Sequence, residues 1–158
     1  MIKQDNKIDM VYLWCDGNDS AFKKRKQQYL KIEDNSEQEN NEAVGDIRFF
    51  DNKELKYSLR SLEMYAPWIN HVYIVTDRQV PKWLNTKYEK VTVVDHSEIM
   101  PQESIPCFNS AVIEYFLPFI PKLSEKFLYG NDDMFFGKKV YQEDFFAGDK
   151  PIVRVKAI

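Results

Sequence analysis

Four short apolar segments of this chain each run into an acidic residue. The segments are 8–14, 72–76, 91–94 and 127–130, and they lead into Asp16, Asp77, Asp95 and Asn131-Asp132-Asp133. Helical patterns separate them, and such an alternation predicts an α/β fold with a mostly parallel sheet flanked by helices. The carboxyl ends of parallel strands lie at one edge, where ligands bind in a crevice. The sequence therefore predicts a carboxylate-lined crevice suited to a divalent metal, a sugar, or both.

The length of 158 residues suits a single α/β domain over residues 1–158. Residues 33–45 are polar and acidic, which predicts a linker or surface excursion. The net charge of −3 argues against a dedicated nucleic-acid binder. The N-terminus lacks the apolar core of a signal peptide, and the most apolar later stretch, 111–120, is too short to span a bilayer. We therefore expect a cytoplasmic protein without a membrane span.

Cysteine and histidine are too scarce for a disulfide framework or a histidine-based zinc site. Cys15 and Cys107 have neither spacing, and the chain has only two histidines. His96 directly follows Asp95, so it is a candidate general base that the aspartate would orient. A structural histidine explains the same step equally well.

The segment Asn131-Asp132-Asp133 is the strongest candidate metal site. In extended backbone Asn131 and Asp133 face one way and Asp132 the other. Mg²⁺ and Mn²⁺ are hard cations that take oxygen ligands, and Mg²⁺ typically uses one or two carboxylates together with substrate phosphates. An ordinary Asn/Asp turn is the simpler interpretation of the segment alone. The three other acidic strand ends favour the metal site.

The turn Asp16-Gly17-Asn18-Asp19 resembles a calcium loop only superficially. Ala21 and Gln27 stand where such a loop needs its glycine and its bidentate glutamate. As a strand-to-helix turn it suits phosphate or ribose, because Gly17 permits close approach and a helix N-terminus offers unpaired N–H groups. Plain turn chemistry is an equally good explanation.

Further patterns predict the elements around these turns. The expected elements are a helix from Asp19 or Ser20 to about Ile32, a second from about Asn52 to Tyr65 with a capping box of Asp51 and Glu54, a short helix opened by Pro81 and carrying Trp83, a third from Asn109 or Ser110 to about Leu117, and a last strand over 152–155.

Two groups of cations accompany these helices. The run Lys23-Lys24-Arg25-Lys26 is interpreted as a solvated helix face, because a short run is a weak signal for a binding patch. Arg48, Lys56 and Arg60 lie near the second helix. An arginine in the crevice would clamp a diphosphate through its fork of donors, whereas a surface pair with a glutamate is the better interpretation of Lys56.

Taken together, these segments resemble the Stealth family of sugar-phosphate transferases, which build bacterial capsular and other exopolysaccharides and include the animal N-acetylglucosamine-1-phosphotransferase. Residues 11–19 resemble the family's first conserved region. Residues 48–62 open a match to the second region, which continues in order through 66–69, 75–84, 94–96, 108–114, 131–135 and 143–146.

The resemblance implies transfer of a hexose-1-phosphate from a nucleotide-diphosphate sugar to a sugar hydroxyl. It also implies a nucleotide-sugar-binding, glycosyltransferase-like core and Mg²⁺ or Mn²⁺ held by Asp132 and Asp133. The candidate catalytic residues are Asp132, Asp133, His96 and Arg60. The candidate substrate-binding residues are Asp16, Gly17, Asp19, Asp51, Asn52, Asn109, Ser110 and Asn131.

The chain departs from the family pattern at four positions and in length. Cys15, Arg78, Cys107 and Gly130 stand where the family usually has other residues. The family's third and fourth regions, which supply further catalytic histidine and arginine residues, have no counterpart before Ile158. We therefore expect an incomplete core, the N-terminal part of a longer catalytic domain, with a second chain supplying the remaining regions.

The expected partners are a nucleotide-diphosphate sugar and a saccharide acceptor, without nucleic acid, and a peripheral association with the capsule machinery. Two alternatives stay open. One is a metal-dependent glycosyltransferase that breaks the sugar–phosphate bond, and the other is a non-catalytic nucleotide-sugar-binding remnant. Product analysis separates the first alternative, because only a sugar-phosphate transferase leaves the phosphate in the new linkage.

Overall fold

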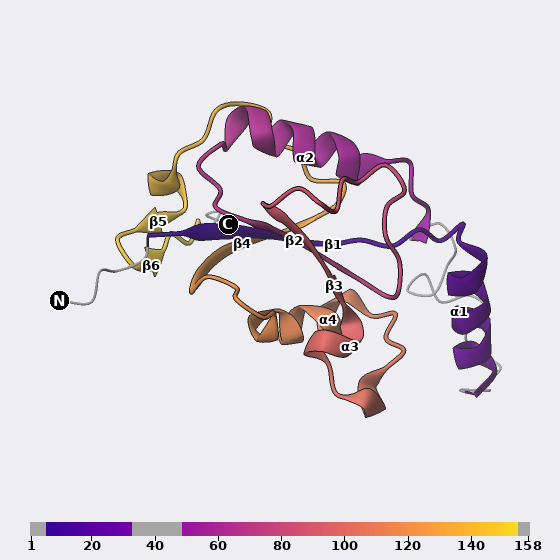
Figure 1. Ribbon diagram of the computed structural model, residues 1–158. Coiled ribbons are helices and arrows are strands. Elements are labelled where there is room, and N and C mark those ends of the chain that lie inside the picture. Colours follow the sequence, from indigo (N-terminus) through magenta and orange to yellow (C-terminus); the bar gives the residue numbers. More distant parts are fainter. Residues whose placement is uncertain (1–5, 33–48, 155–158) are drawn as a thin grey trace, which may run out of the picture.

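The computed structural model describes residues 6–32 and 49–154, and the segment 33–45 predicted as a linker lies outside them. A four-stranded, wholly parallel sheet forms its centre, with the strand order β3-β2-β1-β4 (Figure 1). The strands are β1 (Ile8–Leu13), β2 (Val72–Thr76), β3 (Val91–Asp95) and β4 (Lys126–Asn131). The predicted parallel sheet is therefore confirmed.

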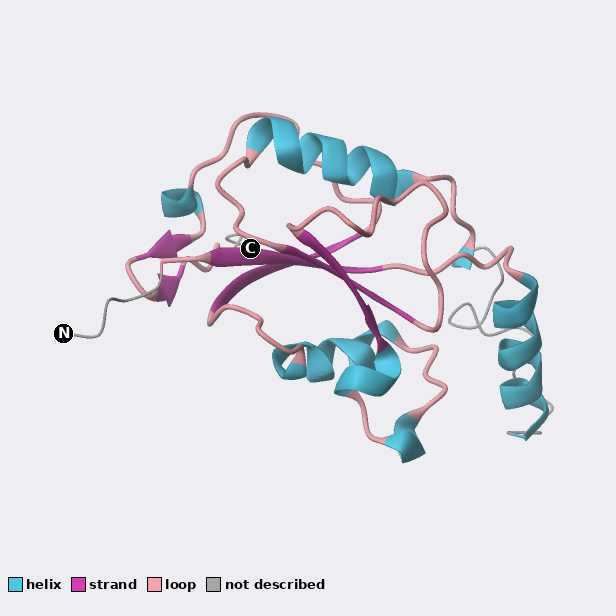
Figure 2. Cartoon of the chain, in the orientation of Figure 1, coloured by secondary structure: helices cyan, strands magenta, loops and turns pink. Residues whose placement is uncertain are grey.

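Helices cover both faces of this sheet (Figure 2). One face carries α2 (Glu54–Tyr65), and the other carries α3 (His96–Ile99) and α4 (Ser110–Phe116). The helix α1 (Ser20–Ile32) stands beyond the carboxyl ends of the strands. The remaining elements are the 3₁₀ helices η3 (Gln102–Ser104), η4 (Leu117–Phe119) and η5 (Gln142–Asp144) and the antiparallel strands β5 (Phe146–Ala147) and β6 (Lys150–Pro151).

The core has two layers because the side chains of β1 alternate between the faces of the sheet. Met10 and Tyr12 pack on the α2 side with Leu55 and Leu62. Val11 packs on the opposite side, in the cluster that α4 and η4 complete with Ile113 and Leu117. A central parallel strand is buried on both faces, which explains why this segment reads as an almost unbroken apolar run.

Two of the predicted helix starts are confirmed, and side-chain caps account for both. The first turn of α1 is closed by Asp19, whose Oδ1 accepts a hydrogen bond from the Phe22 amide at 2.7 Å. Asn109 is the N-cap of α4, and its Oδ1 accepts from the Ala111 amide at 3.0 Å. Capping of this kind satisfies amides that have no partner inside the helix.

The predicted capping box of Asp51 and Glu54 is wrong. The helix α2 begins at Glu54, after Lys53 with a left-handed φ of 70°. Asp51 Oδ1 accepts from the Lys53 amide at 2.9 Å, and Glu54 Oε1 accepts from Asn52 Nδ2 at 2.9 Å. Both carboxylates therefore stabilise the turn before the helix.

Two other predicted elements are absent from the described residues. Residues 81–84 form a turn, closed by a 2.9 Å bond from the Leu84 amide to the Pro81 carbonyl, instead of a short helix. The strand expected over 152–155 does not form in its described part, 152–154. The chain pairs two residues earlier, in β6, after a turn at Gly148 with a φ of +64°.

Candidate functional site

The order of the strands places a topological switch point between β1 and β4. From β1 the chain proceeds to β2 and β3 on one side, and then crosses to β4 on the other side of β1. Ligand crevices in open parallel sheets form at such a reversal, outside the carboxyl ends of the strands. The last residues of the two strands, Leu13 and Asn131, are partners in the sheet. The turns that follow them therefore lie side by side.

The turn after β4 carries the acidic pair Asp132 and Asp133. Asp132 is half-buried and Asp133 is exposed. The Met134 amide closes the turn with a 3.1 Å bond to the Asn131 carbonyl. Asn131 Oδ1 lies 2.9 Å from the Tyr129 hydroxyl, so the side chain of Asn131 is fixed from its own strand.

The acidic pair lies close to the start of α2. Burial, together with the negative charges of Asp133, Glu54 and Asp51, raises the pKa of Asp132 to about 6. The carboxylates of these residues therefore lie near Asp132, and the crevice contains acidic groups from the end of β4 and from the start of α2. Asn52 belongs to the same group through its hydrogen bond to Glu54.

Cys15 links the turn after β1 to this acidic group. Burial, together with the charges of Asp132, Asp16 and Asp51 and against that of Lys26, raises the pKa of its thiol to about 12. The thiol is therefore protonated at neutral pH and is a poor nucleophile. Its surroundings bring the predicted residues Asp16, Asp51 and Asp132 together at one edge of the sheet.

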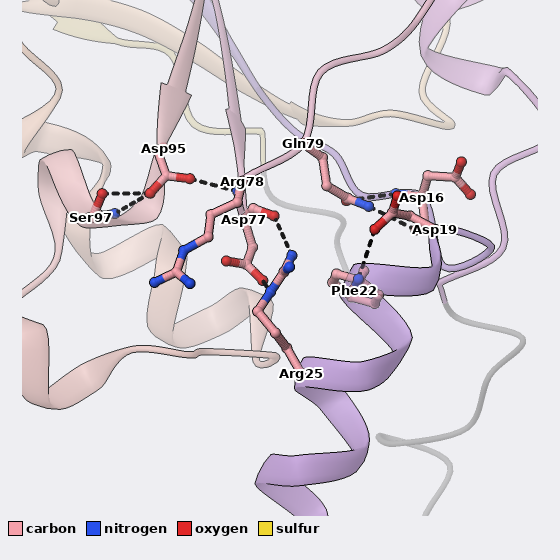
Figure 3. A network of polar contacts seen from close by, with 9 residues as sticks. All are labelled: Asp16, Asp19, Phe22, Arg25, Asp77, Arg78, Gln79, Asp95 and Ser97. Atoms are coloured by element: carbon pink, nitrogen blue, oxygen red, sulfur yellow. Dashed lines mark hydrogen bonds and ion pairs between the residues drawn. The ribbon is translucent and has the colours of Figure 1, made fainter.

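The turn Asp16-Gly17-Asn18-Asp19 is tightly bonded (Figure 3 shows Asp16 and Asp19). The Asn18 amide donates to Asp16 Oδ1 at 2.8 Å, and the Asp19 amide donates to the Asp16 carbonyl at 3.1 Å. A Cβ atom on Gly17 would overlap the carbonyl group of Phe49, to which the Gly17 amide donates. The close approach that needs this glycine is thus made by the protein backbone at Phe49.

The interpretation of Lys23-Lys24-Arg25-Lys26 as a wholly solvated face is wrong for its second half. Arg25 Nε lies 2.9 Å from Asp77 Oδ2, and Asp77 is 3% exposed (Figure 3). Lys26 is buried, with its ammonium 4.3 Å from the centroid of the Phe49 ring. The missed signal is the four-residue spacing from Phe22 to Lys26, which places both on one helix face.

Asp95 caps α3 and does not orient His96 by a hydrogen bond. Its Oδ1 accepts from the Ser97 amide at 3.0 Å, and its Oδ2 accepts from the Arg78 amide at 2.6 Å (Figure 3). Burial opposes ionisation of Asp95, but these hydrogen bonds outweigh it and lower the pKa.

His96 is buried, and its Nδ1 has no hydrogen-bond partner among the described residues. Burial lowers its pKa, against the charges of Asp77 and Asp95, which favours the neutral imidazole at neutral pH. The strand β3 is separated from β4 by β2 and β1. At about 4.8 Å per strand, His96 therefore lies roughly 14 Å from the acidic pair, and the sheet does not bring them together.

The other three predicted site residues make local contacts. Arg60 is exposed on α2, with its guanidinium 5.5 Å from the centroid of the Tyr57 ring. The side-chain oxygen of Asn109 accepts the hydrogen bond that caps α4, and Ser110 is the exposed first residue of that helix. The helix α4 meets the end of β4 through Tyr129, whose hydroxyl lies 2.9 Å from Glu114 Oε1.

The segment after the acidic pair is fastened to α2. Ser58 Oγ donates to the Met134 carbonyl, and Ser61 Oγ accepts from the Phe136 amide at 3.0 Å. Ser58 is fully buried and also lies 3.0 Å from the Tyr12 hydroxyl. These serines hold the turn of Asp132 and Asp133 against the helix. The leucine pattern of α2 gives no hint of them.

Within residues 6–32 and 49–154, no three His, Cys, Asp or Glu side chains form a group that would hold a metal ion by themselves. The acidic pair offers carboxylate oxygens, which suit a hard cation that completes its shell with water and substrate phosphates. The pair therefore fits Mg²⁺ or Mn²⁺ as a partial ligand set. None of the described helices has the length and apolar character needed to cross a membrane.

Comparison with known proteins identifies the family. Residues 48–153 match Stealth protein CR2, conserved region 2. The chain is 44% identical to the exopolysaccharide phosphotransferase cps2G of Lactiplantibacillus plantarum over 90% of its own length and 40% of that protein. It is 43% identical to the capsular polysaccharide phosphotransferase LcbA of Neisseria meningitidis, over 89% of this chain and 38% of that protein.

A third relative, an exopolysaccharide phosphotransferase of Streptomyces coelicolor, is 48% identical over 90% of this chain and 23% of its own length. The chain thus spans well under half of the length of each of these relatives. The match to the second conserved region covers the strands β2, β3 and β4 and includes Asp132 and Asp133. The chain belongs to the Stealth protein family.

Proposed function

We propose that this chain forms the donor-binding part of a sugar-phosphate transferase in capsular or exopolysaccharide synthesis. The reaction would move a hexose-1-phosphate from a nucleotide-diphosphate sugar to a sugar hydroxyl and release a nucleoside monophosphate. The observation that carries the proposal is the convergence of Asp132, Asp133 and the Asp16–Asp19 turn at the switch point between β1 and β4. The names of the phosphotransferase relatives support it.

Asp132 and Asp133 would hold Mg²⁺ or Mn²⁺, which would offset the negative charge of the diphosphate and of the oxygens that share the phosphoryl charge during transfer. The carboxylates that raise the pKa of Asp132 leave a surplus of negative charge in the crevice. A dianionic donor needs that surplus neutralised before it can bind. This requirement is the physical reason for proposing a divalent cation here.

We propose that the donor binds to the residues that surround Asp132 and Asp133. Asp16, Gly17 and Asp19 shape the turn after β1, Asp51 and Asn52 lie at the start of α2, and Asn131 ends β4. Amides of the turn already bond to Asp16, and the Phe22 amide of α1 bonds to Asp19, so the turn is fixed before the donor binds. A preformed surface lowers the entropic cost of binding.

Arg60 and His96 are proposed as further catalytic residues and Asn109 and Ser110 as further substrate-binding residues, although none of the four is among the carboxylates that surround Asp132. His96 is a neutral, buried imidazole with an unpartnered Nδ1 among the described residues. Because the strand order places it roughly 14 Å from the acidic pair, a role as general base would require the acceptor hydroxyl and the reacting phosphate to meet on the β3 side of the sheet. Arg60 would bind phosphate oxygens bidentately.

The proposal includes partners as well as substrates. The relatives are more than twice as long as this chain, so regions corresponding to the rest of their sequence would complete the site, in the same polypeptide or in a second one. We propose a cytoplasmic location with peripheral association with the capsule machinery, where nucleotide-sugars and growing saccharides are available.

Calorimetry of the chain with UDP-, GDP- and dTDP-sugars, with and without Mg²⁺ or Mn²⁺, tests the proposal. We expect metal-dependent binding of one donor class that is lost in Asp133→Ala and retained in Glu143→Ala, an exposed acidic residue of η5. Failure of the folded chain to bind any of these donors would contradict a donor site in this part of the protein. With the full set of regions present, release of a nucleoside diphosphate would indicate a glycosyltransferase instead.

A further inference from the structure

Gln79 reaches from the turn after β2 to the turn after β1 and pairs with both backbone polar groups of Asp16 (Figure 3). The Asp16 amide donates to Gln79 Oε1 at 3.0 Å, and Gln79 Nε2 donates to the Asp16 carbonyl at 2.9 Å. Gln79 is 8% exposed, so water has little access to compete for these bonds. Two parallel hydrogen bonds fix both the position and the orientation of the Asp16 backbone.

This amide continues the sheet beyond its last backbone bond. The pairing of β1 with β2 ends where the Trp14 amide donates to the Val75 carbonyl at 3.0 Å. The strand β2 ends at Thr76, and its register with β1 ends at the pair of Leu13 and Val75. The side chain of Gln79 takes the place of the missing strand neighbour, so the turn after β1 stays in register with the sheet.

The Asp16 backbone in turn determines the shape of the following residues. Its carbonyl accepts from the Asp19 amide as well as from Gln79, and its carboxylate accepts from the Asn18 amide. Any rotation of the Asp16 peptide groups would therefore break the bonds that close the turn. The orientation that Gln79 imposes is passed to the whole of Asp16–Asp19.

The turn that carries Gln79 is itself held in place by hydrogen bonds from neighbouring elements. Asp77 is held by Arg25 of α1, whose Nη2 also donates to the Asp77 carbonyl at 2.9 Å. The Arg78 amide is held by Asp95 at the end of β3. The turn 77–79 thus ties together the carboxyl ends of three strands, and Gln79 is its connection to the candidate donor turn.

We propose that Gln79 is a positioning residue for donor binding, which acts through the Asp16–Asp19 turn without contacting the donor. The inference rests on the proposed function of that turn. An amide is required because the Asp16 backbone needs one acceptor and one donor at the same place. Glutamate has the same shape but sets a carboxylate oxygen against the Asp16 carbonyl, and methionine offers neither bond.

Two measurements on Gln79→Glu and Gln79→Met test the inference. Hydrogen exchange of the backbone amides of residues 16–19, followed by NMR in the free protein, reports on the turn. Calorimetry with the donor and Mg²⁺ reports on its consequence. The matched control is Gln102→Met, because Gln102 is an exposed residue of η3. We expect faster exchange at Asp16 and a weaker donor Kd in both variants, by about tenfold in Gln79→Glu, which loses one hydrogen bond, and by more in Gln79→Met, which loses both.

The outcomes separate this inference from the proposed function. Variants with a lower unfolding temperature but with wild-type exchange at 16–19 and wild-type donor affinity would overturn it, because Gln79 would then be merely structural. A wild-type chain that binds no donor would contradict the proposed function, and the exchange rates alone would then decide whether Gln79 fixes the turn. Unchanged exchange at Asp16 in both variants overturns the inference in either case.

Discussion

Arg25 and Asp77 form a two-point contact between α1 and the end of β2. Arg25 Nε lies 2.9 Å from Asp77 Oδ2, and Nη2 lies 2.9 Å from the Asp77 carbonyl oxygen. The carboxylate is almost fully buried, whereas the arginine side chain is 19% exposed. Removal of the arginine therefore leaves a buried negative charge, whereas removal of the carboxylate leaves a positive charge that can reach water.

Replacing Arg25 with methionine is expected to cost more stability than replacing Asp77 with asparagine. Arg25→Met leaves a buried carboxylate without its cation, which costs about 3 kcal/mol, whereas Asp77→Asn leaves an arginine that can turn toward water. Urea unfolding measures both, and Lys24→Met on the exposed side of α1 is the control. Equal losses in the two variants would contradict this asymmetry.

Asp132→Asn is expected to stabilise the metal-free protein at pH 7.5 but not at pH 4. The folded-state pKa of Asp132 is raised from 3.8 to about 6, so the folded protein binds this proton more tightly than the unfolded chain does. Stability from this group is therefore lost as the pH rises from about 4 through 6. Because Asp132 is only half-buried, the penalty at pH 7.5 is discounted for solvent screening to about 1–2 kcal/mol.

The comparison of urea midpoints of Asp132→Asn and wild type at both pH values checks this prediction. Addition of Mg²⁺ should stabilise the wild type at pH 7.5 and leave the variant nearly unchanged. An asparagine variant that is less stable than wild type at pH 7.5 without metal would show that the carboxylate is not under electrostatic strain.

Arg78→Gly is expected to raise the unfolding free energy by about 1 kcal/mol. Arg78 has a φ of 55°, in the left-handed region that costs an L residue roughly 1–2 kcal/mol and costs glycine little, although glycine also gains entropy in the unfolded chain. Thermal unfolding of Arg78→Gly and Arg78→Ala distinguishes the backbone from the side chain. If both variants were more stable than wild type, the added stability would come from loss of the guanidinium and not from relief of backbone strain at residue 78.

Gly17→Ala is expected to destabilise the protein by about 1–3 kcal/mol and to weaken donor binding. The added Cβ would overlap the Phe49 carbonyl group, and the chain would have to separate there. Gly137→Ala is the matched control, because nothing lies within 4 Å of a Cβ at that position. Thermal unfolding and donor calorimetry on the two variants measure the difference, and similar values for both would rule out the close packing of Gly17.

The central features of the fold could be predicted because they depend on patterns that are local in sequence. The strand β1 is buried on both faces, so its apolar run is almost unbroken, and an Asp residue stands at the end of each strand or within three residues after it. Asp19 and Asn109 are strong helix-capping residues next to the helices that they start. The capping box at Asp51 failed because the same carboxylate satisfies an amide in the turn before the helix equally well.

The remaining features depend on contacts between distant parts of the chain. A run of four cations does not by itself indicate which of them faces inward; the spacing from Phe22 could have indicated Lys26, whereas the pairing of Arg25 with Asp77 has no local signal. Gln79 bonds to a backbone 63 residues away and leaves no pattern in the sequence. The separation of His96 from Asp132 follows from the strand order, which a list of strands does not contain. The roles of the candidate site residues stay predictions.

The pairing of β1 with β4 has a consequence for how the protein folds. The first strand of the chain has its partners in β2 and in β4, where Ile8 pairs with Lys126. Contacts between such distant residues form slowly, because the intervening chain must first lose its freedom. During synthesis β2 can pair with β1 and with β3 while β4 has yet to be made. The acidic crevice is therefore completed last, and the proposed donor site would form only after β4 has joined β1.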